Sequence, residues 1–141
     1  MYEPIRTPSV HAMADPDKAR CGLPRRSREE ELDDRLAGHL TALLTVTDEL
    51  RVLTPDTELD TAAQRITARV TRLCGGRAPL RAIPSAPEGG APRLTALHQR
   101  AHTLAGQALV VATSRADAEA IALAAQRMEA HARALGLTRT G

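Results

Sequence analysis

Four histidines lie on segments of this sequence that are predicted to be helical: His39, His98, His102 and His131. Imidazole titrates near neutral pH and is a common ligand of transition metals. Measured from the predicted turn of each helical hairpin, His39, His98 and His131 fall within roughly 3 Å of one height, and His102 lies one turn away. Three or four such side chains could bind zinc or another transition metal, two could hold a haem, and one could act as an acid or base.

A plainer interpretation competes with this histidine site. Each of the four residues flanks an apolar stripe, where histidines are usually boundary residues bonded to water or to a backbone carbonyl. The spacing of His98 and His102 is weak evidence alone. The sequence has no Glu-x-x-His pair and no His-Glu-x-x-His motif, which disfavours a ferritin-like di-iron site and a zincin. We therefore favour boundary histidines over a metal site.

Three arginines, Arg65, Arg69 and Arg72, follow helical spacing and share one face of a predicted helix. The surrounding segment, residues 61–87, contains no acidic residue. The guanidinium fork matches carboxylate and phosphate groups, so this stripe is a candidate site for an anion or a partner. The alternative, which we favour, is that the arginines pair with Asp48, Glu49 or the acidic start of the first helix, or are simply solvated.

The elements that must position these residues are four helices. Apolar residues recur every three or four positions over about 28–53, 55–74, 92–112 and 115–135, which is the period of an amphipathic helix. Ser27 and Glu30 form a capping-box signature, and Gly75 and Gly136 are typical of helix ends. Residues 1–27 hold four prolines without a sustained apolar period, and are expected to form a disordered or loosely docked tail.

No strand signal is found, so the chain is expected to be all-α. Residues 28–136 are predicted to form an up-down-up-down four-helix bundle of two antiparallel hairpins. Its core would be leucine and alanine, and the proline-rich segment 75–92 would be a crossover linker. The residues of the last helix expected to face inward are Ile121, Ala124, Ala125, Met128, Ala132 and Leu135.

Composition and charge exclude several classes of protein. The chain of 141 residues has one aromatic residue, Tyr2, so it lacks the set of rings needed to stack nucleic-acid bases or to cage a quaternary ammonium ligand. The net charge of +2 comes entirely from residues 1–27, and the neutral remainder argues against duplex binding. No apolar run is long enough for a membrane span, no secretory signal is recognised, and the expected compartment is the cytoplasm.

The stretch Leu36-Ala37-Gly38-His39-Leu40-Thr41-Ala42-Leu43-Leu44 resembles the first helix of small uncharacterised helical proteins from GC-rich filamentous bacteria. Some of these are described as natural-product biosynthesis proteins. The resemblance covers the first predicted hairpin. It implies no established activity and no catalytic residues, and it favours a gene near specialised metabolism.

These observations favour a small cytosolic helical accessory or interaction protein without catalysis of its own. It would meet a protein partner or a second copy of itself through the arginine stripe or the proline-rich segment. The alternative is a bundle that binds a metal or another ligand, or a small biosynthetic enzyme, that uses the four histidines. A nucleic-acid partner and a membrane partner are not expected.

Overall fold

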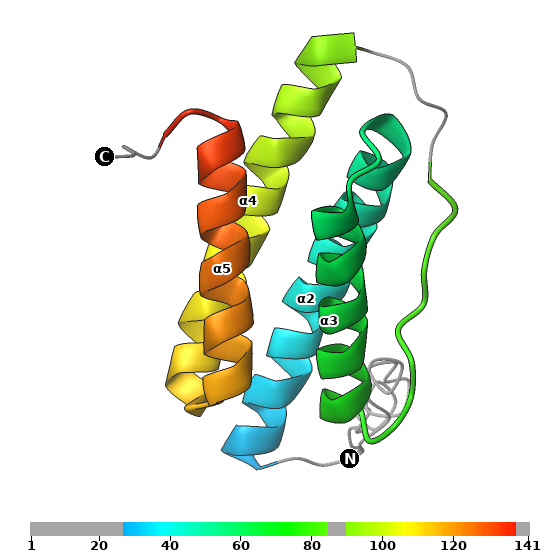
Figure 1. Ribbon diagram of the computed structural model, residues 1–141. Helices are drawn as coiled ribbons and strands as arrows, with labels where there is room; N and C mark the ends of the chain where they lie inside the picture. Colours follow the sequence, from blue (N-terminus) through cyan, green and yellow to red (C-terminus); the bar gives the residue numbers. More distant parts are fainter. Residues whose placement is uncertain (1–26, 85–89, 138–141) are drawn as a thin grey trace, which may run out of the picture.

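The computed structural model describes residues 27–84 and 90–137, and these residues form four α-helices (Figure 1). The helices are α2 (Arg28–Leu53), α3 (Thr57–Leu73), α4 (Gly90–Arg115) and α5 (Ala118–Ala134). The described residues contain no strand, which confirms the all-α helical bundle. The tail predicted for residues 1–27 lies outside the described part of the chain, apart from Ser27.

Side-chain caps begin three of the helices. Ser27 accepts a hydrogen bond from the backbone of Glu30 and its own N–H donates to the Glu30 carboxylate, so the predicted capping box is confirmed. Helix α3 begins at Thr57 and not at 55, because Asp56 is its cap. Likewise Asp117 caps α5, so the fourth helix begins at Ala118 and not at 115.

The ends of α3, α4 and α5 share one backbone motif. In each helix, the backbone N–H of the second residue after the C-cap donates to the carbonyl five residues earlier. The N–H of the first residue after the C-cap donates to the carbonyl three residues earlier, which completes the Schellman pattern. The motif requires a left-handed residue, and Gly75 and Gly136 supply it with φ of 67° and 75°. At the end of α4 the same place is taken by Ala116 with φ 60°.

The order of helix directions differs from the up-down-up-down order expected. Arg115, the last residue of α4, pairs with Asp33 in the first turns of α2, while Arg93 near the start of α4 pairs with Glu49 near the end of α2. Helices α2 and α4 are therefore antiparallel neighbours, and α3 and α4 run in the same direction (Figure 1). The bundle is up-down-down-up, still built from two antiparallel hairpins.

The segment between α3 and α4 makes this order attainable. It runs the length of the α2/α3 hairpin on its outside in Figure 1, apart from the undescribed residues 85–89. Arg81 fastens it to α2 through two hydrogen bonds to the buried Asp48 carboxylate, of 2.7 and 3.1 Å. An extended chain covers about 3.3 Å per residue against 1.5 Å in a helix, so this connection is long enough to return along the bundle.

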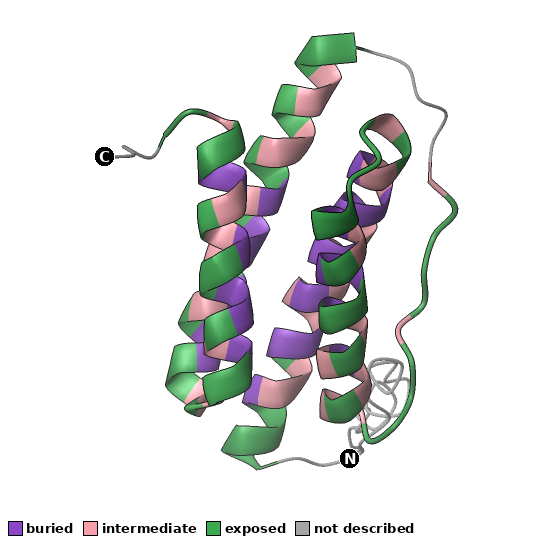
Figure 2. Ribbon diagram, viewed as in Figure 1, coloured by how far each residue is buried: buried purple, intermediate pink, exposed green. Residues whose placement is uncertain are grey.

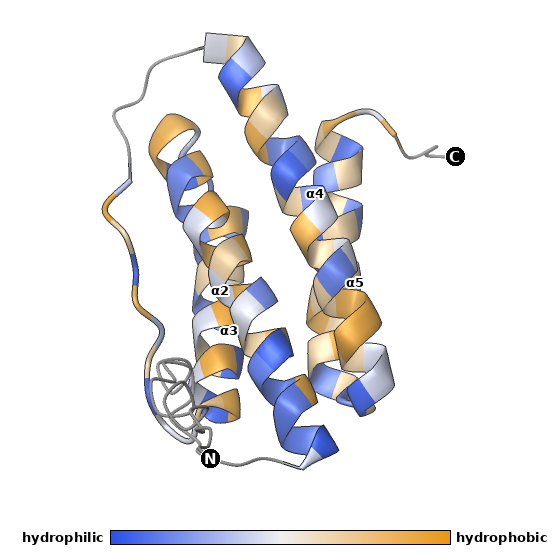
Figure 3. Cartoon of the chain, turned by 180° about the vertical axis from the view of Figure 1, so that it is seen from behind, coloured by the Kyte–Doolittle hydropathy of each residue, from blue (hydrophilic) through white to orange (hydrophobic). Residues whose placement is uncertain are grey.

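The core lies between the two hairpins, where the buried faces of the helices meet (Figure 2). Leucines of α2 pack there against small residues of α4 and α5, as expected from the composition. The first three turns of α4 contribute no fully buried residue, because burial on that helix begins at Ala101. The start of α2 also lies outside the core, and its exposed acidic first turn is hydrophilic in Figure 3.

The inward face predicted for the last helix is partly wrong. Ala124 and Ala132 are buried as expected, but Ala125 is exposed, and Ile121, Met128 and Leu135 are only partly buried. The helix is rotated so that two polar residues, Arg127 and His131, lie in the interior beside Ala120 and Leu123. The reason is that these two side chains find partners on α3 and α4. None of the described helices is long and apolar enough to cross a membrane.

Candidate functional site

Two of the predicted histidines meet inside the bundle. The Nδ1 atoms of His98 on α4 and His131 on α5 are 3.0 Å apart, and the ring centroids are 5.2 Å apart. The His131 side chain is fully buried and that of His98 is half-buried. Because the two rings contact each other directly, no porphyrin fits between them, and this pair does not form the haem site considered from the sequence.

Arg127 decides the protonation of this pair. Its Nη2 lies 3.2 Å from Nε2 of His131, and a guanidinium can only donate a hydrogen bond. Nε2 of His131 must therefore be unprotonated, so the proton of the neutral ring is on Nδ1 and is donated to Nδ1 of His98. The hydrogen bonds run in one direction, from Arg127 through His131 to His98, and both rings are neutral.

The environment stabilises these neutral rings. Burial, and then the charge of Arg127, lower the pKa of His131 from 6.5 to about 3. The same two causes lower the pKa of His98. An imidazole with so low a pKa is a poor general base near neutral pH, because it seldom binds a proton there.

The four histidines do not come together as one metal site. The ion pairs between α2 and α4 place His39 level with the part of α4 beyond His102, away from the His98–His131 pair. His102 is close enough to influence His131 electrostatically. Within residues 27–84 and 90–137, no three or more histidine, cysteine or carboxylate side chains are arranged to hold a metal ion. The expected common height holds for His98 and His131, which lie on one hairpin. It is wrong for His39, because that part of the prediction depended on the up-down-up-down order.

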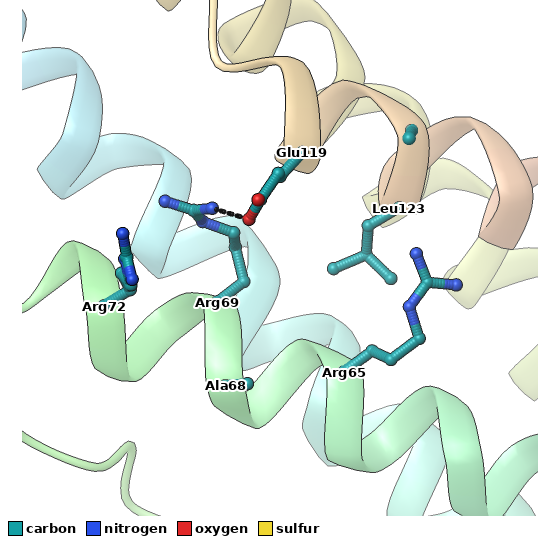
Figure 4. A pocket seen from close by; sticks show the side chains of 7 residues that line it. Arg65, Ala68, Arg69, Arg72, Glu119 and Leu123 are labelled. Carbon is teal, nitrogen blue, oxygen red and sulfur yellow. Dashed lines mark hydrogen bonds and ion pairs between the residues drawn. The ribbon is translucent and has the colours of Figure 1, made fainter.

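The three predicted arginines are brought to one wall of a groove between α3 and α5. Arg65, Arg69 and Arg72 line a cavity of about 380 Å³ together with Glu119 and Leu123 of α5 (Figure 4). Leu123 points toward α3 between the arginines in that view. Helix α3 makes far less contact with α5 than with α2, which leaves this side of the bundle open.

Two further cavities extend the groove in both directions. One, of about 200 Å³, shares Arg65 and lies near the start of α3, and the other, of about 290 Å³, shares Arg69 and Arg72 and reaches the end of α4. We call the three together the α3/α5 groove. Five of its lining residues are arginines: Arg65, Arg69, Arg72, Arg115 and Arg127.

The arginines of this groove differ in how they are partnered. Arg69 joins the two helices, since its Nη1 lies 2.5 Å from the Glu119 carboxylate and its Nε 3.7 Å from that of Asp117. Arg65 donates to the neutral amide of Gln126. No carboxylate of the described residues pairs with Arg65 or Arg72, so their charges are available at the groove.

The pairing that we favoured from the sequence is not what the structure shows, although Arg65 and Arg72 are exposed, as the solvated alternative expected. Asp48 pairs with Arg51 and Arg81, and Glu49 pairs with Arg93. At the acidic start of α2, Asp33 pairs with Arg115. Arg69 instead finds its partners on α5. The stripe faces α5 because α3 packs its apolar stripe against α2, which turns the neighbouring face toward the second hairpin.

Sequence reasoning missed Arg127 and Glu58. The Arg127 side chain is 1% exposed, and its Nη1 donates to the carboxylate of Glu58 in the first turn of α3. A signal was present, because Arg127 continues the helical spacing of Ala120, Leu123 and Ala124 and lies four residues before His131. That spacing places it on the buried face once the rotation of α5 is known.

No protein-family model matches the chain, and no curated protein and no solved structure shows significant similarity to it. The resemblance to small helical proteins of GC-rich filamentous bacteria therefore stays a prediction. Any function has to be argued from the geometry of the groove and of the buried polar residues.

Proposed function

We propose that the protein is a small helical interaction protein whose α3/α5 groove binds an acidic segment of a partner protein. The single observation that carries this proposal is that Arg65 and Arg72 have no carboxylate partner among the described residues. Both arginines line the groove. Guanidinium groups left without an anion on the wall of a cavity suit a partner that brings carboxylates.

An acidic polypeptide fits the groove better than a nucleic acid does. Between the arginines the lining is apolar, with Ala68, Ala122 and Leu123, which suits the methylene groups of glutamate side chains. A phosphate backbone needs a broad basic surface, whereas residues 28–141 carry no net charge. The absence of tryptophan and phenylalanine also removes the means of stacking bases.

The test is binding of fluorescently labelled poly-glutamate, followed by anisotropy at low and at physiological salt. We expect the double variant Arg65→Glu/Arg72→Glu to lose about tenfold or more in affinity, since two contacts become repulsive. The control is Arg100→Glu/Arg133→Glu, which makes the same change in net charge on α4 and α5 outside the groove. An equal loss in the control, or binding of polyphosphate but not of poly-glutamate, would contradict the proposal.

A setting in specialised metabolism and association with a second copy stay predictions from the sequence. The large apolar side chains that are exposed in the described residues are spread over several elements: Val52, Leu80, Ile83, Val110 and Leu137. Val52 and Ile83 line one cavity beside Arg81, but Val110 lies on α4 and Leu137 follows α5, so the five do not form one face for a second copy. We therefore give the groove, and not an apolar face, the role of the contact surface.

A further inference from the structure

Arg127 has an environment that folding alone does not explain well. It carries a permanent charge, yet its side chain is 1% exposed in the interior of α5. Its carboxylate partner among the described residues, Glu58, is 52% exposed and lies at the edge of the groove. Its second partner, His131, is a neutral ring that offers a lone pair and no charge.

A buried cation of this kind costs stability unless it is well compensated. Replacing a buried ion pair by apolar residues is often neutral or stabilising, so stability is a weak reason for such an arginine. The compensation here is also incomplete, because Nε of Arg127 is buried and has no hydrogen-bond partner among the described residues. The guanidinium therefore has unused capacity to donate hydrogen bonds.

A cavity lies at this point of the groove. Its volume is about 200 Å³, and both Glu58 and Arg127 line it. Thr57, Thr61 and Gln126 add polar groups to its wall, and Arg65 connects it with the larger cavity. Ligand pockets for whole small molecules are usually larger, about 300 Å³ or more, so this one suits a single carboxylate side chain.

We infer that Arg127 binds a carboxylate of the acidic partner, and that Glu58 occupies the position of that carboxylate in the free protein. The inference rests on the proposed function. It places one carboxylate of the partner in the cavity near the start of α3. On binding, the partner's carboxylate takes the hydrogen bond from Nη1, and Glu58, already half in solvent, turns outward. One carboxylate replaces another, so the buried charge stays compensated throughout.

The test removes the internal competitor without removing its hydrogen bond. Glu58→Gln keeps an oxygen that accepts from Arg127 but has no charge, so competition falls while the hydrogen bond remains. Because the buried guanidinium then lacks a counter-charge, circular dichroism first checks that the variant is folded. We expect the affinity for labelled poly-glutamate to rise by about tenfold, the amount that one charged hydrogen bond accounts for. The matched control is Glu129→Gln on α5, whose exposed carboxylate pairs with Arg133 outside the groove.

A second measurement reads Arg127 itself. In the Glu58→Gln variant, the Nε–H resonance of Arg127 should shift on addition of sodium acetate, and not with sodium chloride of the same ionic strength. If Glu58→Gln binds poly-glutamate no more tightly than Glu129→Gln does, while Arg65→Glu/Arg72→Glu still loses affinity, the inference is overturned and the proposed function stands. If acetate shifts Arg127 but poly-glutamate does not bind, the carboxylate site is supported and the polypeptide partner is not.

Discussion

His131 lies between a permanent cation and a second imidazole, and this position makes its protonation a test of the buried network. The Nε2 atom accepts from Arg127 and the Nδ1–H donates to His98. A proton added at Nε2 would face the donors of Arg127. Protonation of His131 therefore requires the hydrogen bond from Arg127 to break, which contributes to the low pKa of His131.

We predict that the protein loses stability as the pH falls below about 6.5. The pKa of His131 is about 3 in the folded protein and 6.5 in the unfolded chain, so the unfolded state binds the extra proton between these values. The free energy of unfolding should fall by about 1 kcal/mol between pH 6.5 and pH 5.5, and the slope approaches about 1.4 kcal/mol per pH unit below that interval. Urea titrations between about pH 6.5 and pH 5.5 measure this slope before most carboxylates titrate.

The matched comparison is between His131→Gln and His102→Gln. The first variant removes the titrating group beside Arg127 and should flatten the slope, and the second keeps the bond to Arg127 and should retain the slope. Equal slopes for the natural protein and His131→Gln would show that His131 is not the neutral, buried acceptor described above.

At the scale of the elements, the turn between α4 and α5 contains a strained residue. Ala116 adopts φ 60° in the Schellman motif that ends α4, where glycine is preferred because it has no Cβ. A left-handed conformation costs an L-residue about 1–2 kcal/mol. The two corresponding positions in this chain are Gly75 and Gly136, which carry no such cost.

We predict that Ala116→Gly stabilises the protein by about 0.5–1 kcal/mol. The relief of strain exceeds the larger backbone entropy that glycine has in the unfolded chain. Chemical denaturation measures the difference. The control, Ala125→Gly at an exposed position inside α5, should instead destabilise by about 1 kcal/mol, because glycine is a poor helix former. A loss of stability with Ala116→Gly would mean that the left-handed turn is not maintained in solution.

For the whole molecule, the direction of α4 is the decisive feature. The pairs Arg115–Asp33 and Arg93–Glu49 hold opposite ends of α2 and α4 together. In the up-down-up-down order the two helices would be parallel, and both pairs would be separated by most of the helix length, about 39 Å for 26 residues.

We predict that Asp33→Cys/Arg115→Cys is linked within one chain by a short bismaleimide, while Asp33→Cys/Arg93→Cys is not. Both are made with Cys21 and Cys74 replaced by serine. Peptide mapping of the monomer band after proteolysis identifies the link. Preferential linking of positions 33 and 93 would require parallel α2 and α4, and would contradict the observed order.

The helices and their ends could be predicted from the sequence because they depend on local interactions. The caps at Ser27 and Glu30, the glycines at positions 75 and 136 and the apolar spacing on α2 act within a few residues, so they specify helices and their ends without the rest of the fold. The presence of an arginine stripe on one face of α3 was readable for the same reason.

Only the tertiary structure decided how these helices are ordered and which polar residues are buried. A long crossover allows either direction for α4, and the ion pairs with α2 accompany the direction observed. The rotation of α5 depends on contacts across the bundle, where Glu58 and His98 offer partners to Arg127 and His131. Residues that are 33 or 69 positions apart cannot reveal such contacts through local spacing. The sequence therefore determined four helices and their faces, while the packing between them selected the buried histidine pair and the arginine-lined groove.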